Sequence, residues 1–217
     1  MTKIKICGLR SLRDIEAVNA AGPDFAGFVV EAPGSRRSVD RRELRELAGK
    51  LGKEIISAGV FVNAPAELVA ELLEEGTLGV AQLHGQEDAA YIRRLRRLTD
   101  KPLIQAFSIR TKEDVRRALE SEADYLLFDQ GSGGTGLTFD WSLILEVTRP
   151  FFLAGGLGEE NLEEAVLKVR PWAVDLSSSL ETDGRKDPEK IRRAAELVRR
   201  LNQGEAARGG AGTEAEP

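Results

Sequence analysis

Short apolar segments alternate with longer amphipathic segments along most of this chain. The short segments are rich in β-branched and aromatic residues, which is typical of buried strands. Eight strands are predicted, at Lys3–Ile6, Phe25–Val30, Ile55–Phe61, Val80–Leu83, Leu103–Phe107, Tyr125–Phe128, Phe151–Ala154 and Ala173–Leu176.

The longer segments place apolar residues at helical spacing and charged residues between them. Ser11, Asp40, Thr111 and Asp140 stand where N-cap residues are expected. Eight helices are predicted, at Leu12–Ala21, Arg41–Leu51, Ala66–Glu75, Ala89–Leu98, Lys112–Leu119, Trp141–Val147, Leu162–Val169 and Pro188–Leu201.

Strands that alternate with helices pair in parallel, with each helix as the crossover. Eight such units predict a single-domain α/β fold, a closed (β/α)8 TIM barrel, because closure leaves no unpaired strand edge. Alternation alone also fits an open, doubly wound sheet. We expect the barrel to span residues 1–201 and the Gly-, Ala- and Glu-rich tail, residues 202–217, to be disordered.

Composition argues against several classes of function. The net charge of −5 favours neither a nucleic-acid nor a membrane partner, and the basic run Arg93–Arg97 is interpreted as a solvated helix face. No apolar run has transmembrane length and no signal-peptide pattern is present, so we expect a cytoplasmic location. The only cysteine is Cys7 and the only histidine is His84, which excludes an internal disulfide and leaves too few ligands for a zinc site.

Glycine, hydroxyl and charged residues follow nearly every predicted strand, whereas the segments before the strands resemble ordinary turns. A parallel barrel forms its active site from the loops that follow its strands. This asymmetry predicts an enzyme. The residues concerned include Cys7, Arg36, Arg37, Asn63, His84, Asp129, Gly155, Gly156 and Ser177–Ser179.

The last two of these loops predict a phosphate site. Loops after the seventh and eighth strands of such barrels often bind phosphate through backbone N–H groups. Gly155 and Gly156 allow the backbone to approach an anion closely, and Ser178 and Ser179 add hydroxyl and amide donors. Two tight turns without a ligand are the alternative reading.

Cys7 and Asp129 end the first and sixth strands and could face each other across the barrel mouth. A thiolate can act as a base, and a carboxylic acid with a raised pKa can donate a proton. Taken singly, Cys7 could be a core residue and Asp129 a cap or salt-bridge partner. Arg36 or Arg37 could bind a carboxylate as a bidentate fork.

The segment Gly131–Gly136 matches the dinucleotide pattern G-x-G-x-x-G. That pattern should open a helix directly, but Leu137-Thr138-Phe139 intervenes here. We therefore interpret the segment as a lid over the site.

Ordered blocks along the chain resemble phosphoribosylanthranilate isomerases from Lys3 to about Leu201. The blocks are Lys5-Ile6-Cys7-Gly8, Gly27-Phe28-Val29, Gly59-Val60-Phe61-Val62-Asn63, Gln82-Leu83-His84-Gly85, Asp129 with Gly133-Gly134-Thr135-Gly136, Phe139-Asp140-Trp141, Ala154-Gly155-Gly156-Leu157 and Ala173-Val174-Asp175-Leu176-Ser177-Ser178. Each block is weak alone, but the ordered set is specific.

The resemblance implies an aldose–ketose isomerase, an intramolecular oxidoreductase, that catalyses an Amadori rearrangement in tryptophan biosynthesis. It implies Asp129 as general acid, Cys7 as general base and Arg37 as the contact for the anthranilate carboxylate. It also implies a phosphorylated small-molecule substrate held by Gly155, Gly156, Ser178 and Ser179, with no metal or organic cofactor. His84, Asn63 and Asp175 are expected as further active-site residues, and the chain is expected to be a monomer or a homodimer.

One departure and two alternatives remain. Ser179 stands where the family usually has glycine, and a left-handed backbone there would be strained. Another phosphosugar isomerase, such as an aminoimidazole carboxamide ribotide isomerase, would have an aspartate in place of Cys7. A non-catalytic phosphate-ligand binder would not need both Cys7 and Asp129.

Overall fold

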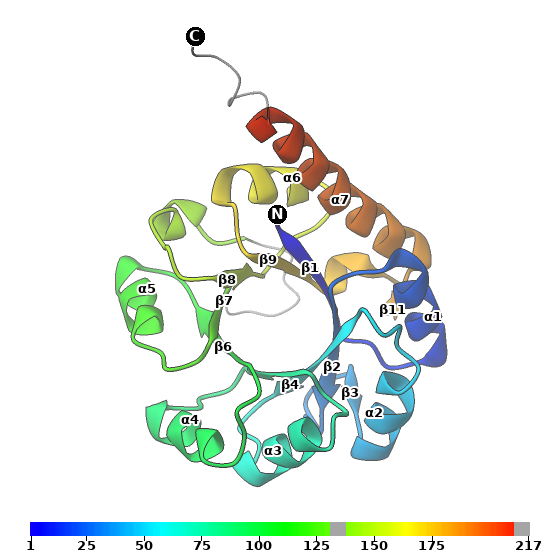
Figure 1. Cartoon of the computed structure of the whole chain (residues 1–217), viewed down its shortest axis with the longest axis vertical. Coiled ribbons are helices and arrows are strands. Elements are labelled where there is room, and N and C mark those ends of the chain that lie inside the picture. The colour runs from blue at the N-terminus through cyan, green and yellow to red at the C-terminus, as the bar shows by residue number, and fades with distance from the viewer. Residues whose placement is uncertain (131–137, 211–217) are drawn as a thin grey trace.

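The computed structural model describes residues 1–130 and 138–210, with side chains as far as residue 204. Eight parallel strands form a closed ring with helices around it (Figure 1). Strand β1 pairs with both β2 and β9, which closes the barrel. The predicted barrel is therefore confirmed, and the open sheet is wrong. The barrel strands are β1 (Lys3–Cys7), β2 (Phe25–Val30), β4 (Ile56–Phe61), β5 (Val80–Leu83), β6 (Leu103–Ser108), β7 (Tyr125–Asp129), β8 (Phe151–Leu153) and β9 (Ala173–Leu176).

Helices cover the outside of the barrel (Figure 1). The predicted caps are confirmed, because the side chains of Ser11, Asp40, Thr111 and Asp140 each accept a hydrogen bond from a backbone N–H of the first turn. The α-helices are α1 (Leu12–Ala21), α2 (Arg41–Ala48), α3 (Ala66–Glu74), α4 (Ala89–Arg96), α5 (Lys112–Leu119), α6 (Leu162–Glu164) and α7 (Pro188–Gly210). Among the described helices none is long and apolar enough to cross a membrane.

Two predicted helices are shorter or less regular than expected. Trp141–Val147 contains only a 3₁₀ helix, η1 (Trp141–Ile144), because its aromatic and β-branched residues have weak helix propensity and Pro150 follows closely. The segment Leu162–Val169 divides into α6 and a π-helical turn, η2 (Ala165–Val169). It ends before Pro171, which disfavours continuation of a helix.

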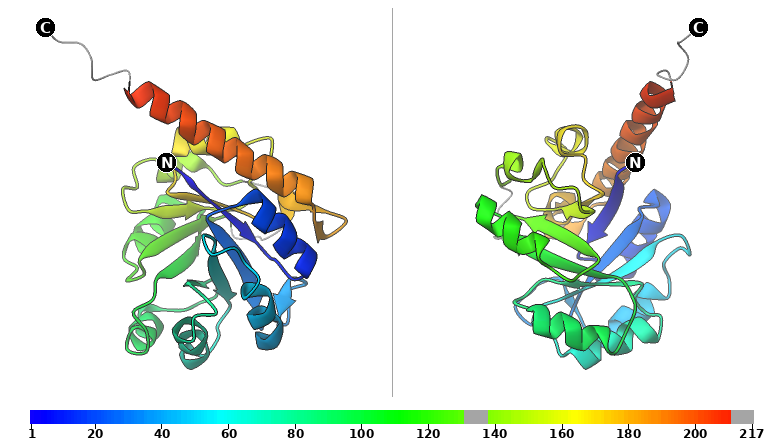
Figure 2. Two further views of the ribbon diagram at one scale, coloured as in Figure 1. Left: turned by 45° about the vertical axis from the view of Figure 1, so that its right-hand side comes forward. Right: turned by 60° about the vertical axis from the view of Figure 1, so that its left-hand side comes forward.

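The last helix is longer than expected. Helix α7 continues to Gly210, past the predicted end at Leu201, and its end projects beyond the barrel (Figure 2). Residues such as Glu205, Ala206 and Ala207 favour helix, and extending an existing helix avoids the cost of nucleation. The described part of the predicted tail, residues 202–210, thus continues the helix, and residues 211–217 lie outside the described part.

Several short strands and one 3₁₀ helix lie at the end of the barrel where the barrel strands end. Strand β3 (Ser38–Val39) pairs with β2. The 3₁₀ helix η3 (Ser178–Leu180) leads into a hairpin of β10 (Glu181–Thr182) and β11 (Arg185–Lys186). Its turn is Asp183-Gly184, both with positive φ, which is the conformation that a two-residue hairpin favours.

Apolar side chains fill two cores. The larger lies between the strands and the helices and includes Ile4, Ile6 and Phe28. The smaller includes Phe25 and Phe152, whose rings are 5.5 Å apart, and Trp172 packs against it. This second core fills part of the barrel interior and leaves room for polar side chains nearer the C-terminal ends of the strands.

Candidate active site

Strand alternation aims the polar side chains of β1 into the barrel. Successive side chains of a strand point to opposite faces. Ile4 and Ile6 pack in the outer core, so Lys5 and Cys7 face inward. Cys7 is the last residue of β1 and reaches the cavity at the barrel mouth.

The same rule applies to three other strands. Outward residues such as Leu83, Phe128 and Leu176 belong to the outer core. Their inward neighbours line a cavity of about 430 Å³. These inward residues are Gln82 and the following His84 from β5, Asp129 from β7, and Asp175 and the following Ser177 from β9.

This cavity brings together most of the predicted site residues. It is lined by Cys7, Arg36, Arg37, His84, Asp129, Gly155, Gly156, Asp175 and Ser178, together with apolar residues such as Val60 and Leu157. Its volume lies in the range of small-molecule sites. Residues far apart in the sequence therefore share one concave surface at the C-terminal ends of the strands.

Asn63 and Ser179 are not among the residues that line this cavity. Asn63 joins two loops instead: its Oδ1 accepts from the backbone N–H of Gln86, and its own N–H donates to Glu87. Ser179 does not have a positive φ, so the strain that we considered for a serine at this position is absent.

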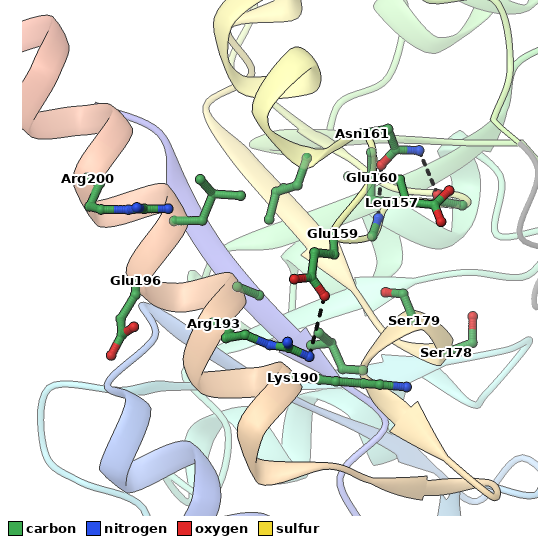
Figure 3. Close-up of a pocket in the computed structure, with 16 residues that line it drawn as sticks. Leu157, Glu159, Glu160, Asn161, Ser178, Ser179, Lys190, Arg193, Glu196 and Arg200 are labelled. Carbon is green, nitrogen blue, oxygen red and sulfur yellow. Dashed lines mark hydrogen bonds and ion pairs between the residues drawn. The ribbon is translucent and has the colours of Figure 1, made fainter.

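Ser179 lines a neighbouring cavity of about 730 Å³ between η3, the loop after β8, and α7 (Figure 3). Arg193 in this cavity pairs with Glu159 at 3.4 Å. Gly156 and Ser178 line both cavities. The two loops predicted to bind phosphate therefore form the wall between them.

Gly155 packs directly against the Asp129 carboxyl. A Cβ at Gly155 would lie 2.7 Å from Asp129 Oδ1 and 2.7 Å from the backbone nitrogen of Gln130. Its φ of +82° is also a conformation that favours glycine. A side chain at this position would therefore displace the carboxyl or its loop.

His84 approaches the second carboxyl oxygen of Asp129. Its Nε2 is 3.9 Å from Asp129 Oδ2, and its Nδ1 is 2.8 Å from the amide nitrogen of Gln82. Burial lowers the pKa of His84, and the negative charge of Asp129 opposes that shift only in part. The ring is therefore neutral at neutral pH, and its Nδ1 accepts the hydrogen bond from Gln82.

Arg37 is held by Glu181, the first residue of the hairpin. Its Nε donates to Glu181 Oε1 at 2.6 Å and its Nη2 to Oε2 at 3.1 Å. Arg36 and Lys186 also pair with this carboxylate, at 2.8 and 3.2 Å. Only 5% of the Glu181 side chain is exposed, so one buried carboxylate fixes three cations at the rim of the cavity.

A second charged pair lies deeper in the barrel. Lys5 Nζ donates to Asp175 Oδ2 at 2.7 Å, and the Lys5 side chain is fully buried. Asp175 Oδ1 and Gln82 Oε1 are buried and have no hydrogen-bond partner among the residues that the structure describes. These two acceptors belong to residues that line the cavity, so they are available to donors on a ligand.

Sequence reasoning did not select Lys5 or Glu181. Lys5 could have been found, because it lies two residues before Cys7 and therefore on the same face of a strand that is otherwise mostly apolar. Glu181 reaches the site only through the hairpin, which the dipeptide Asp183-Gly184 could have predicted.

The predicted lid, residues 131–136, lies outside the described residues. No group of three or more His, Cys, Asp or Glu side chains that could hold a metal ion occurs among residues 1–130 and 138–204.

A closed parallel barrel with ionisable side chains and glycine turns around one cavity at its C-terminal end defines the class of (β/α)8-barrel enzymes. Comparison with known proteins identifies the family. Residues 4–196 match the family model for N-(5'-phosphoribosyl)anthranilate (PRA) isomerase, and the chain belongs to this family. Its members are aldose–ketose isomerases, so the predicted family and enzyme class are confirmed.

Relatives of known name and structure agree with this assignment. The N-(5'-phosphoribosyl)anthranilate isomerase of Endomicrobium trichonymphae is 44% identical over 205 residues, which cover 93% of this chain and all of that relative. The crystal structure of the Thermus thermophilus enzyme is 37% identical, with a TM-score of 0.81 over 92% of this chain and all of that one. A third, in complex with reduced 1-(o-carboxyphenylamino)-1-deoxyribulose 5-phosphate, is 33% identical with the same TM-score, over 92% of this chain and 99% of that chain.

Proposed function

We propose that this enzyme converts N-(5-phosphoribosyl)anthranilate into 1-(2-carboxyphenylamino)-1-deoxyribulose 5-phosphate in tryptophan biosynthesis, with Asp129 as general acid and Cys7 as general base. The observation that supports the assignment of roles is that a thiol from β1 and a carboxyl from β7 line one small cavity. We infer that the reaction takes place in the cytoplasm, and the single cysteine, Cys7, fits such a reducing compartment.

The reaction begins at the ring of the sugar. Asp129 donates a proton to the ring oxygen as the C1–O bond breaks, which leaves an open-chain iminium ion. The thiolate of Cys7 removes the proton from C2, and the electron pair moves toward the iminium nitrogen to give an enolamine. A proton is then added at C1 while the C2 hydroxyl becomes a carbonyl. C1 is reduced and C2 is oxidised, so no external oxidant is needed.

The substrate is anionic at both ends, with a carboxylate at one end and a phosphate at the other. Both ends must be held in place while the carbons between them react. We assign the anthranilate carboxylate to Arg37 and the phosphate to the turns of Gly155, Gly156, Ser178 and Ser179. Arg37 lines the same cavity as the first three of these phosphate-turn residues. Holding both ends places C2 beside the base, and such positioning lowers the barrier.

His84 and Asp175 supply polar contacts in the same cavity. A neutral His84 beside Asp129 can hydrogen-bond to the substrate without competing for the proton of the acid. Asp175 Oδ1 has no partner in the described structure and can accept from a sugar hydroxyl. Asn63 stays outside this set, because its side chain serves the loops after β4 and β5.

Two substitutions test the assignment. Asp129→Asn keeps the shape of the side chain but removes the acid, and we expect turnover to be lost. Cys7→Ser replaces a thiolate with a far poorer base, and we expect kcat to fall by orders of magnitude. The assay follows the loss of phosphoribosylanthranilate fluorescence, and calorimetric binding of the reduced product analogue checks that each variant still folds its site. A variant with the kcat of wild type would refute the role proposed for the residue that it replaces.

A further inference from the structure

Lys5 is a charged residue in an unusual place, fully enclosed inside the barrel. Its Nζ donates a hydrogen bond to Asp175 Oδ2 at 2.7 Å. A buried ion pair is often no more stable than apolar side chains of the same size, so the pair is weak evidence of a purely structural role. The mechanism described above does not use Lys5.

Lys5 lies next to the thiol of Cys7. Both residues face the barrel interior from β1, two positions apart. A Cβ on Gly27 of the neighbouring strand β2 would lie 2.8 Å from Cys7 Sγ and 3.1 Å from Lys5 Cε. The sulfur and this carbon therefore lie within about 6 Å of each other, and the absence of a side chain at Gly27 gives both of them room.

The charges around Cys7 come from several elements. Lys5 on β1 and Lys186 on β11 are positive, and Asp175 on β9 is negative. Asp129 and His84 line the same cavity. Burial raises the pKa of the Cys7 thiol, the charge of Lys5 opposes this most strongly, and Asp175 adds to the rise.

We propose that Lys5 is a positioning residue for the isomerase reaction, whose buried ammonium stabilises the thiolate of Cys7 beside the substrate, while Asp175 holds that ammonium in place. This inference rests on the proposed function of Cys7 as the base. A thiol enclosed by the barrel would otherwise remain protonated, and a protonated thiol cannot accept the proton from C2.

Because Cys7 is the only cysteine, its ionisation can be measured without interference from other thiols. The rate of alkylation by iodoacetamide is followed against pH, with Cys7→Ser as the blank. Lys5→Met keeps an unbranched side chain and removes the charge. We expect it to raise the midpoint of thiol ionisation by about one unit or more, the shift that a charge at this distance produces. Asp175→Asn should move the midpoint the opposite way.

Two further variants keep the test decisive if Lys5→Met fails to fold. The double variant Lys5→Met/Asp175→Asn leaves no unpaired buried charge, and its midpoint should lie above that of Asp175→Asn alone. Lys5→Arg retains a positive charge and should restore the wild-type midpoint. Midpoints that agree within about a third of a unit across all the folded variants would overturn the proposal.

Turnover gives an independent readout. We expect Lys5→Met to lower kcat at neutral pH by about tenfold or more, with a smaller loss as the pH rises and the thiolate forms without help. A loss of kcat that is the same at every pH would indicate a structural role only and would overturn the proposal. Undiminished turnover in Cys7→Ser, by contrast, would refute the proposed base and leave the measured coupling of Lys5 to Cys7 unaffected.

Discussion

Replacing Gly155 with alanine tests whether the loop after β8 shapes the site of Asp129. Two costs are expected from the structure. The φ of +82° is unfavourable for any residue with a Cβ, by about 1–2 kcal/mol. The new methyl group would also lie 2.7 Å from both Asp129 Oδ1 and the backbone nitrogen of Gln130, and relieving such overpacking costs about 1–3 kcal/mol more.

Gly76 provides a matched control. Its φ is +81°, and a Cβ there would have no atom within 4 Å. Gly76→Ala should therefore show the backbone cost alone, about 1–2 kcal/mol, with normal turnover. Gly155→Ala should lose about 2–5 kcal/mol of unfolding free energy. Its kcat should fall about a hundredfold, since a displacement of about 1 Å at a reacting group costs that much.

Urea unfolding followed by tryptophan fluorescence measures the free energy, using Trp141 and Trp172 as reporters. The fluorescence assay for phosphoribosylanthranilate measures kcat. Equal losses of stability in the two glycine variants would show that the loop moves aside without cost. A kcat for Gly155→Ala within about twofold of wild type would refute the claim that this contact positions Asp129.

Two further predictions concern the charges around the cavity. Glu181→Gln should lower the free energy of unfolding by about 3 kcal/mol at neutral pH, because three cations lose one buried carboxylate. Burial acts to raise the pKa of Glu181, but the bonds to Arg37 and Lys186 outweigh it and leave the pKa below its ordinary value. The difference from wild type should therefore disappear in urea titrations as the pH falls below about 4, whereas a constant difference would contradict the ion-pair explanation. The buried His84 has a lowered pKa, so the unfolded chain takes up its proton first. Wild type should lose stability as the pH falls through about 6.5, His84→Asn should lose less, and identical pH dependence in the two proteins would contradict the neutral, buried ring.

Periodicity predicted the barrel because each strand contributes a run of apolar residues and each helix a repeating apolar face. Periodicity gave the wrong helix type or the wrong helix end where two local features of a segment indicated different structures. Trp141–Val147 has apolar residues at helical spacing but weak propensity, and only a 3₁₀ turn forms. Helix α7 continues past the predicted end at Leu201, because extending an existing helix avoids the cost of nucleation.

The site was predictable where it depends on strand order and not where it depends on side-chain contacts. Cys7 and Asp129 each end a strand, so topology alone brings them to one cavity. The pairing of Arg37 with Glu181 depends on a hairpin that folds back over the rim, and no spacing along the chain encodes that contact. Asn63 likewise follows a strand as expected, but its side chain accepts a hydrogen bond from the loop after β5, and the sequence does not encode that contact.

The smaller apolar core lies beneath the cavity and explains why the few charges in the cavity interact strongly. Phe25, Phe152 and Trp172 fill part of the barrel interior, so water reaches the polar residues from the mouth. Charges in such a poorly hydrated site influence one another more than charges in water do. The ammonium of Lys5 can then offset the burial of the Cys7 thiol, an effect that solvent would screen at the surface. The proposed acid, base and positioning charges would depend on this enclosure, which the barrel supplies by placing apolar residues deep in its interior and polar residues at the ends of strands such as β1, β7 and β9.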